Sequence, residues 1–263
     1  MSLTPPRKRT RMPEPTLNSA STARRALALL DLTDLGDTCT ATQVDALCRD
    51  ARAGGVAAVC VWPQFVHQAA RVLAGGPVRI ATVINFPAGG EDVDCAVEDT
   101  AEALRDGAHE IDLVLPYRAL LRGDAEAARL MVEAVREACP GTALKVILET
   151  GELQARETVA TASRLALAAG ADFIKTSTGK SAVSATPEAA ETMLHAIREA
   201  GRGGLKVSGG LRTLADAATY LALTDQVMGS GWAGPGTFRL GASSLFGVLM
   251  AARGDATSPE ATP

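Results

Sequence analysis

Short runs of β-forming residues alternate eight times with alanine-rich stretches of helical period along this chain. The runs cover residues 27–34, 56–62, 78–86, 109–115, 143–150, 171–177, 205–208 and 237–241. They recur roughly every 30 residues, which is the length of one strand followed by one helix. Eight such units favour a single closed (β/α)8 TIM barrel. An open doubly wound sheet stays as the alternative.

Helix signals between the runs agree with that interpretation. Thr40 and Gln43 have the spacing of a capping box, and Thr186 followed by Pro187 is typical of a helix start. Within 91–105, apolar residues recur at spacings of three and four, which predicts a helix with one buried face.

The composition is typical of one folded domain with polar tails. Of the 263 residues, 47% are hydrophobic and only 3% aromatic, so the core must consist mainly of aliphatic side chains. We expect a disordered, basic and proline-rich tail over 1–20, a catalytic barrel over 21–252 and a flexible tail over 253–263. The basic run over 7–11 leaves open a second interpretation, a localisation or nucleic-acid patch.

Charge, hydropathy and cysteine usage argue against several classes of protein. The net charge of −4 disfavours a nucleic-acid partner, and no apolar run approaches the roughly 18 residues of a membrane span. The five cysteines form no C-x-x-C pair, which indicates reduced thiols and a cytoplasmic protein. Neither the cysteines nor the histidines have metal-ligand spacing, and the G-x-G-x-x-G match at 229–234 follows no strand. We therefore expect neither a metal nor an organic cofactor.

Charged residues occupy the inward face of several predicted strands. Side chains alternate between the two faces of a strand, so the aliphatic face of a barrel strand packs on the helices and the other points inward. By this alternation six charged residues point into the barrel: Asp31, Asp112, Lys145, Glu149, Lys175 and Lys206. A barrel interior normally holds aliphatic residues because burying charge is costly. The cluster predicts an active site at the C-terminal mouth, with a structural ion-pair network as the alternative.

Lysines inside a barrel favour Schiff-base chemistry. A neutral lysine amine attacks a carbonyl, and the resulting iminium accepts electrons during carbon–carbon cleavage. A lysine with an ordinary pKa of about 10.4 is protonated at pH 7, but burial and a neighbouring cation both lower that pKa. Lys175 and Lys206 supply the nucleophile and the neighbouring cation, and Asp112 can transfer protons.

Two glycine-containing loops predict a phosphate site. Barrel enzymes often bind phosphate with the loops after strands seven and eight. In this chain those loops carry Gly209-Gly210 and Gly241-Ala242-Ser243-Ser244. Their backbone N–H groups and serine hydroxyls can approach an anion closely.

Several motifs resemble those of the 2-deoxyribose-5-phosphate aldolase family. They are Asp31-Leu32-Thr33, Asn85-Phe86-Pro87, Glu110-Ile111-Asp112-Leu113-Val114, Leu115-Pro116-Tyr117-Arg118, the run 145–153, the run 171–180 around Lys175, and Gly241-Ala242-Ser243-Ser244. The resemblance spans about 25–250 and is most specific around Lys175. The chain departs from the usual family motifs at Trp62 and at Val207-Ser208.

The resemblance implies a class I aldolase that reversibly cleaves 2-deoxy-D-ribose 5-phosphate to D-glyceraldehyde 3-phosphate and acetaldehyde, without a cofactor and as a homodimer. It assigns the Schiff base to Lys175, the perturbation of that lysine to Lys206 and proton transfer to Asp112. Further implied roles are contacts near the substrate hydroxyl and water (Asp31, Thr33), electrostatic support (Lys145, Glu149) and substrate or phosphate binding (Thr178, Lys180, Gly209, Gly210, Gly241, Ser243, Ser244). A Schiff-base aldolase of different donor specificity and a non-catalytic phosphosugar-binding barrel stay as alternatives.

Overall fold

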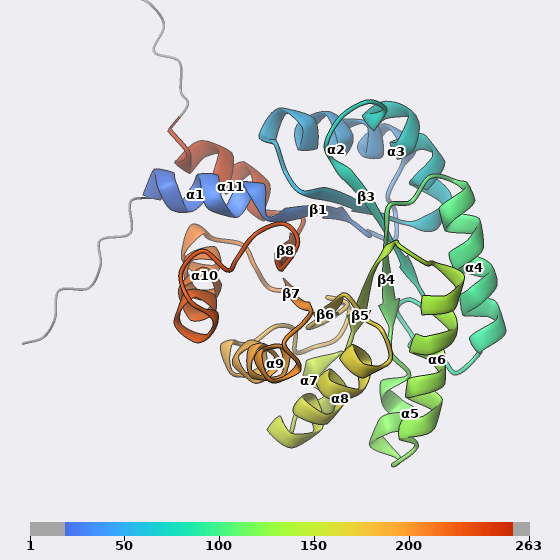
Figure 1. The fold of residues 1–263 in the computed structure, drawn as a ribbon. Helices are drawn as coiled ribbons and strands as arrows, with labels where there is room; N and C mark the ends of the chain where they lie inside the picture. Colours follow the sequence, from blue (N-terminus) through green and yellow to red (C-terminus); the bar gives the residue numbers. More distant parts are fainter. Residues whose placement is uncertain (1–18, 255–263) are drawn as a thin grey trace, which may run out of the picture.

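The computed structural model describes residues 19–254, which form a closed barrel of eight parallel strands (Figure 1). Each strand pairs with the next in chain order, and the last pairs with the first. The strands are β1 (Leu30–Asp34), β2 (Ala58–Val61), β3 (Arg79–Ile84), β4 (Glu110–Val114), β5 (Ala143–Ile147), β6 (Phe173–Lys175), β7 (Gly204–Ser208) and β8 (Phe238–Ala242). The predicted (β/α)8 barrel is confirmed, and the open sheet is wrong.

Helices surround the barrel and connect its strands. They are α1 (Ser19–Ala28), α2 (Ala41–Gly54), α3 (Val66–Leu73), α4 (Val93–Arg105), α5 (Tyr117–Leu121), α6 (Ala125–Ala138), α7 (Thr150–Leu153), α8 (Arg156–Ala168), α9 (Pro187–Ala200), α10 (Leu214–Met228) and α11 (Leu245–Ala252), with a 3₁₀ turn η1 (Pro63–Phe65) before α3. In Figure 1, α1 and α11 lie side by side although they come from opposite ends of the chain. None of the helices within 19–254 has both the length and the apolar character of a membrane span.

Two boundaries at the start of the chain differ from the predictions. Residues 27–28 were expected to begin the first strand, but they belong to α1, and β1 begins at Leu30. Helix α1 starts at Ser19, inside the tail predicted over 1–20, while the tail residues 1–18 and 255–263 lie outside the described residues. The apolar face of α1 explains the first difference, because Ala23, Ala26 and Leu27 repeat at helical spacing and are buried.

The predicted helix starts are confirmed. Thr40 and Gln43 form both hydrogen bonds of a capping box at the start of α2. Thr186 caps α9 by accepting a hydrogen bond from the backbone N–H of Ala189, with Pro187 at the first helical position. The predicted helix within 91–105 is α4, and Ala96 lies on its buried face.

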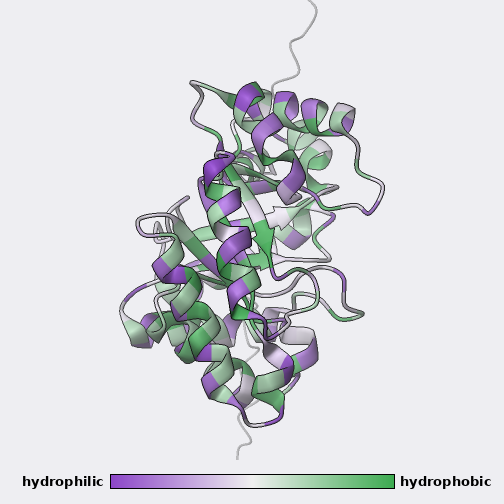
Figure 2. Ribbon diagram, turned by 90° about the vertical axis from the view of Figure 1, so that its right-hand side faces the viewer, coloured by the Kyte–Doolittle hydropathy of each residue, from purple (hydrophilic) through white to green (hydrophobic). Residues whose placement is uncertain are grey.

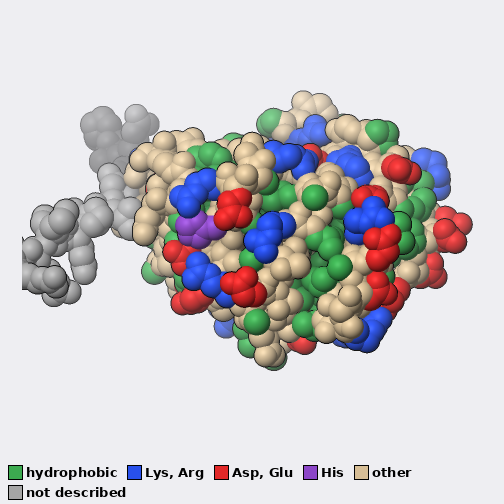
Figure 3. All heavy atoms as spheres, turned by 60° about the horizontal axis from the view of Figure 1, so that its bottom comes forward, with side chains coloured by type: hydrophobic (Ala, Val, Ile, Leu, Met, Phe, Trp, Pro, Cys, Tyr) green, Lys and Arg blue, Asp and Glu red, His purple; other side chains and the backbone are tan. Residues whose placement is uncertain are grey.

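The main hydrophobic core lies between the strands and the helices. On β4, Ile111 and Leu113 point into this core, while Asp112 between them points into the barrel and is also fully buried. Figure 2 shows hydrophobic strands surrounded by helices of mixed hydropathy, as expected when one helix face meets the sheet and the other meets water. On the outer face drawn in Figure 3, basic and acidic side chains are interspersed.

Parallel register brings the inward charges to neighbouring positions. Lys145 on β5 lies opposite Asp112 on β4. Lys206 on β7 lies opposite both Lys175 on β6 and Arg239 on β8. These pairings gather ionisable side chains from distant parts of the sequence inside one barrel.

Candidate active site

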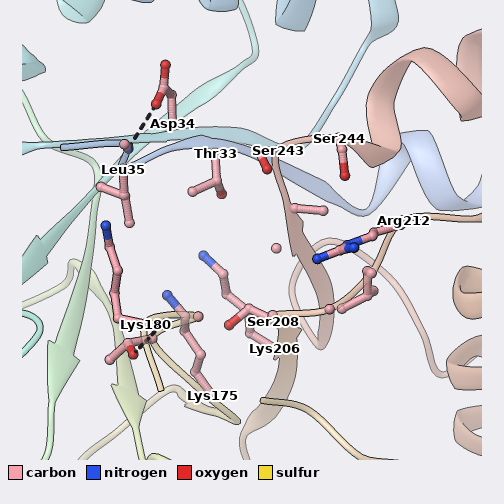
Figure 4. A pocket seen from close by; sticks show the side chains of 18 residues that line it. Thr33, Asp34, Leu35, Lys175, Lys180, Lys206, Ser208, Arg212, Ser243 and Ser244 are labelled. Atoms are coloured by element: carbon pink, nitrogen blue, oxygen red, sulfur yellow. Dashed lines mark hydrogen bonds between the residues drawn. The ribbon is translucent and has the colours of Figure 1, made fainter. Parts of the chain in front are cut away.

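A cavity of about 390 Å³ opens at the C-terminal mouth of the barrel. It is lined by the ends of β1, β6, β7 and β8 and by the loops that follow them. Figure 4 shows the amines of Lys175 and Lys206 pointing into this cavity from neighbouring strands. The cavity also includes eight other predicted residues: Thr33, Thr178, Lys180, Gly209, Gly210, Gly241, Ser243 and Ser244. The C-terminal mouth is where (β/α)8 enzymes place their active sites.

The carboxylate of Asp112 stands at the centre of the buried charges. One oxygen, Oδ2, accepts hydrogen bonds from Lys175 Nζ at 2.8 Å and from Lys206 Nζ at 2.7 Å. The other oxygen accepts one from Lys145 Nζ at 2.8 Å. Since Asp112 is fully buried, these three lysines take the place of water around its charge.

A second group of ion pairs lies deeper in the barrel. Asp31 lies 2.6 Å from Lys206 Nζ and, through its other oxygen, 2.6 Å from Arg239 Nη1. Glu110 joins Arg239 Nη2 at 2.8 Å to Lys145 Nζ at 2.7 Å. The structure therefore brings together five of the six predicted inward charges and adds Glu110 and Arg239.

Sequence reasoning missed these two additional residues although the signal was present. Arg239 lies between Phe238 and Leu240 on β8, just as Lys206 lies between two aliphatic residues on β7. Glu110 has the same strand parity as Asp112. Applying the alternation to every residue of these strands would have found both.

Lys175 and Lys206 differ in their electrostatic surroundings. Burial, and then the Lys206 ammonium, hold the pKa of Lys175 below its usual value, against the opposing effect of Asp112. Burial also disfavours the charged form of Lys206, but Asp112 and Asp31 outweigh it and raise the pKa of Lys206. The protons therefore favour Lys206, and Lys175 is the better nucleophile.

Asp112 remains ionised in this environment. Burial alone would raise its pKa, but Lys145, Lys175 and Lys206 together hold the pKa of Asp112 well below the usual range. At neutral pH Asp112 is therefore a carboxylate, which is the form that can accept a proton from a reacting group. The protons of Lys145 and Lys206 stay on those lysines.

Glu149 does not point into the interior network as predicted. Strand β5 ends at Ile147, and Glu149 adopts a left-handed backbone conformation with φ of 57°, so strand alternation does not apply to it. Its buried carboxylate instead accepts hydrogen bonds from Thr178 Oγ1 at 2.6 Å and Ser181 Oγ at 2.9 Å. Glu149 thus holds the loop between β6 and α9 beside the cavity.

Lys180 extends from that same loop across the mouth. Its amine forms an ion pair with Asp37 at 2.7 Å and lies 5.9 Å from the ring centre of Trp62. Thr33 on β1 also lines the cavity, and its hydroxyl donates a hydrogen bond to the backbone carbonyl of Asp31 at 2.8 Å. Lys180 therefore places a cation at the rim of the cavity. The hydrogen bond to Asp31 orients Thr33 in the same cavity as Lys175 and Lys206.

The loops after β7 and β8 form the wall of the cavity opposite Lys180. A side chain at Gly241 would come within 2.8 Å of the Ser208 Cβ, so only glycine leaves this space open. Ser244 precedes α11, and its side chain makes no capping bond there. Arg212 also lines the cavity, and Figure 4 shows its guanidinium directed inward.

Glycines, serines and an arginine together make this wall suitable for an anion. Backbone N–H groups, the start of a helix and a guanidinium all favour phosphate oxygens. Sequence reasoning found the glycines and serines and missed Arg212, since no strand or helix periodicity says where a loop side chain points.

Within 19–254, no group of three or more His, Cys, Asp or Glu side chains is placed to hold a metal ion.

Comparisons with known proteins agree with this geometry. A family model described as DeoC/LacD family aldolase matches residues 21–245. The chain is 50% identical over 233 residues to the deoxyribose-phosphate aldolase of Agrobacterium fabrum, a match that covers 87% of this chain and 90% of that protein.

Solved structures show the same architecture. A Toxoplasma gondii protein assigned as a deoxyribose-phosphate aldolase, in its apo form, superposes with a TM-score of 0.83 at 28% identity, covering 90% of this chain and 98% of that one. The deoxyribose phosphate aldolase of Aeropyrum pernix, described as tetrameric, gives a TM-score of 0.73 at 24% identity over 90% and 98% of the two chains. At that identity the second likeness concerns the fold alone.

Proposed function

Since the chain belongs to the DeoC/LacD family of aldolases, we propose that it reversibly cleaves 2-deoxy-D-ribose 5-phosphate to D-glyceraldehyde 3-phosphate and acetaldehyde. One observation carries this proposal. A buried lysine of lowered pKa, Lys175, shares a carboxylate oxygen with a protonated lysine beside an anion-binding wall. That arrangement suits imine formation with a phosphorylated aldehyde.

Lys175 is the nucleophile in this mechanism. Its neutral amine attacks the aldehyde carbon C1 of the open-chain sugar, and loss of water from the resulting carbinolamine gives a protonated imine. Removal of the proton from the C3 hydroxyl then breaks the C2–C3 bond. The bonding electrons move to the imine as an enamine, and glyceraldehyde 3-phosphate leaves. Protonation at C2 and addition of water release acetaldehyde and restore Lys175.

Asp112 and Lys206 both act on the amine of Lys175. Asp112 Oδ2, 2.8 Å from Lys175 Nζ, is placed to take and return the protons of carbinolamine formation and of the enamine step. Lys206, held as an ammonium by Asp112 and Asp31, keeps Lys175 unprotonated by repulsion. Lys145 supports Asp112 through its second carboxylate oxygen.

The remaining predicted residues bind and orient the substrate. We assign the phosphate to the wall that contains Arg212, with Lys180 facing it across the mouth. The rest of this wall consists of Gly209, Gly210, Gly241, Ser243 and Ser244. Thr33, with Asp31 behind it, faces the substrate hydroxyls and water, while Glu149 holds Thr178 in place.

Covalent trapping tests this function directly. The protein is incubated with acetaldehyde and sodium borohydride, digested and analysed by mass spectrometry. A reduced two-carbon adduct on the peptide that contains Lys175 supports the proposal. An unmodified peptide would instead favour a non-catalytic phosphosugar-binding barrel, and turnover with dihydroxyacetone but not acetaldehyde as donor would favour a different donor specificity.

The cellular setting and the assembly remain predictions. We place the enzyme in the cytoplasm because its five cysteines are free, three of them buried, and free thiols are typical of a reducing compartment. The homodimer that the sequence resemblance implies is open to direct measurement by light scattering, which would distinguish it from a tetramer like that described for the Aeropyrum pernix protein.

A further inference from the structure

The buried charges inside the barrel balance when Lys175 has no proton. Three carboxylates, those of Asp31, Glu110 and Asp112, are matched by three cations, Lys145, Lys206 and Arg239. All six are buried, so an excess charge among them is poorly compensated by solvent. A proton on Lys175 would add a fourth cation to three anions.

The groups that act directly on Lys175 inside the barrel are Asp112 on β4, Lys206 on β7 and Cys60 on β2. Ion pairs of Asp112 and Lys206 connect these groups to the rest of the buried network, which consists of Asp31 on β1, Glu110 on β4, Lys145 on β5 and Arg239 on β8. Burial raises the pKa of the Cys60 thiol, so it adds no charge. At the mouth, Asp34, Lys180 and Arg212 line the same cavity but are at least partly exposed, where solvent screens them.

Arg239 and Glu110 take part in this balance without lining the cavity. Building on the proposed function, we propose that they are positioning residues that set the charge of the Lys175 amine from beneath the active site. Arg239 binds one oxygen of Asp31 at 2.6 Å and one of Glu110 at 2.8 Å. The other oxygens of those two carboxylates face Lys206 and Lys145, at 2.6 and 2.7 Å.

Asp31 and Glu110 are therefore each shared between Arg239 and a lysine that lies within 2.7 Å. Without the arginine charge, three carboxylates would face two permanent cations, and a proton on Lys175 would offset the difference. Without the charge of Glu110, two carboxylates would face three cations, and Lys175 would bind a proton less readily. Removing both charges restores the balance.

This reasoning predicts opposite effects for two single variants and their cancellation in the double variant. The measured quantities are the acidic limb of kcat/KM against pH and the pH dependence of trapping acetaldehyde on Lys175 with cyanoborohydride. For Arg239→Gln we expect both midpoints to rise by about one pH unit or more, and for Glu110→Gln we expect both to fall. The Glu110→Gln, Arg239→Gln double variant should return close to the wild-type midpoint.

Two further variants separate charge from packing. Arg239→Lys keeps the positive charge and should stay close to wild type. Arg25→Gln removes a cation that pairs with Asp225 outside the barrel, and it should leave the midpoints unchanged. If Arg239→Gln fails to fold, as judged by circular dichroism, the Glu110→Gln variant and the double variant still decide the question.

The outcomes also separate this inference from the proposed function. Unshifted midpoints in the single variants, or a double variant that keeps the midpoint of Arg239→Gln, would overturn the role of Arg239 and Glu110. In either case an adduct on wild-type Lys175 would leave the aldolase function standing. The absence of an adduct from the wild-type protein would refute the proposed function itself.

Discussion

Replacing Lys206 with leucine tests the electrostatic basis of the proposed mechanism. The amines of Lys175 and Lys206 lie 2.8 and 2.7 Å from the same Asp112 oxygen, so their nitrogens are at most 5.5 Å apart. With an effective dielectric constant of about 20, two unit charges at that separation repel by about 3 kcal/mol. This energy corresponds to about 2 pH units in the pKa of Lys175.

The direction of the effect follows from the state of Lys175. Its pKa is lowered by burial and by Lys206, so the loss of Lys206 raises that pKa and favours the protonated, unreactive form of the nucleophile. We expect the acidic limb of the kcat/KM profile to move up by about 2 pH units, so that kcat/KM measured on the acidic side of both midpoints falls by about 100-fold. Activity should recover as the pH rises past the new pKa.

The assay is the retro-aldol rate, measured from about pH 5 to 10 by coupling glyceraldehyde 3-phosphate to a dehydrogenase that oxidises it. The matched control, Lys206→Arg, keeps a cation at the same position and should keep the acidic limb near its original place. A Lys206→Leu enzyme with an unshifted profile would refute the reasoning. Loss of rate at every pH, with no recovery in alkali, would show that Lys206 acts by some means other than its charge.

Three other expected outcomes test different parts of the molecule. Lys175→Leu should abolish both turnover and the borohydride adduct, since the proposed imine forms on this amine; an adduct on another residue would contradict the assignment. Arg212→Ala should raise KM for the phosphorylated substrate by about tenfold or more and change KM for an unphosphorylated aldehyde little; equal effects on both substrates would remove Arg212 from the phosphate site. Thr40→Ala, which removes the cap of α2, should lower the free energy of unfolding in urea by about 1 kcal/mol without changing kcat, and no loss of stability would show that the capping box contributes nothing.

Strand alternation predicts much of the candidate site from the sequence alone. Lys206 between Leu205 and Val207, and Asp112 between Ile111 and Leu113, can only face opposite to their aliphatic neighbours. The same rule, applied to all eight strands, would have included Arg239. It failed at Glu149 because β5 ends two residues earlier and the chain turns there.

The sequence by itself determined the number of strand–helix units, their helix starts and the inward face of most strands. These features depend on local propensity and on periods of two and 3.6 residues, which are properties of the chain alone. Which charges meet was decided by the closed barrel, because its register sets Asp112 beside three lysines and joins Arg239 to two carboxylates. The inward turn of Arg212 was likewise decided only in the folded loop, since a loop side chain takes its direction from the surfaces around it.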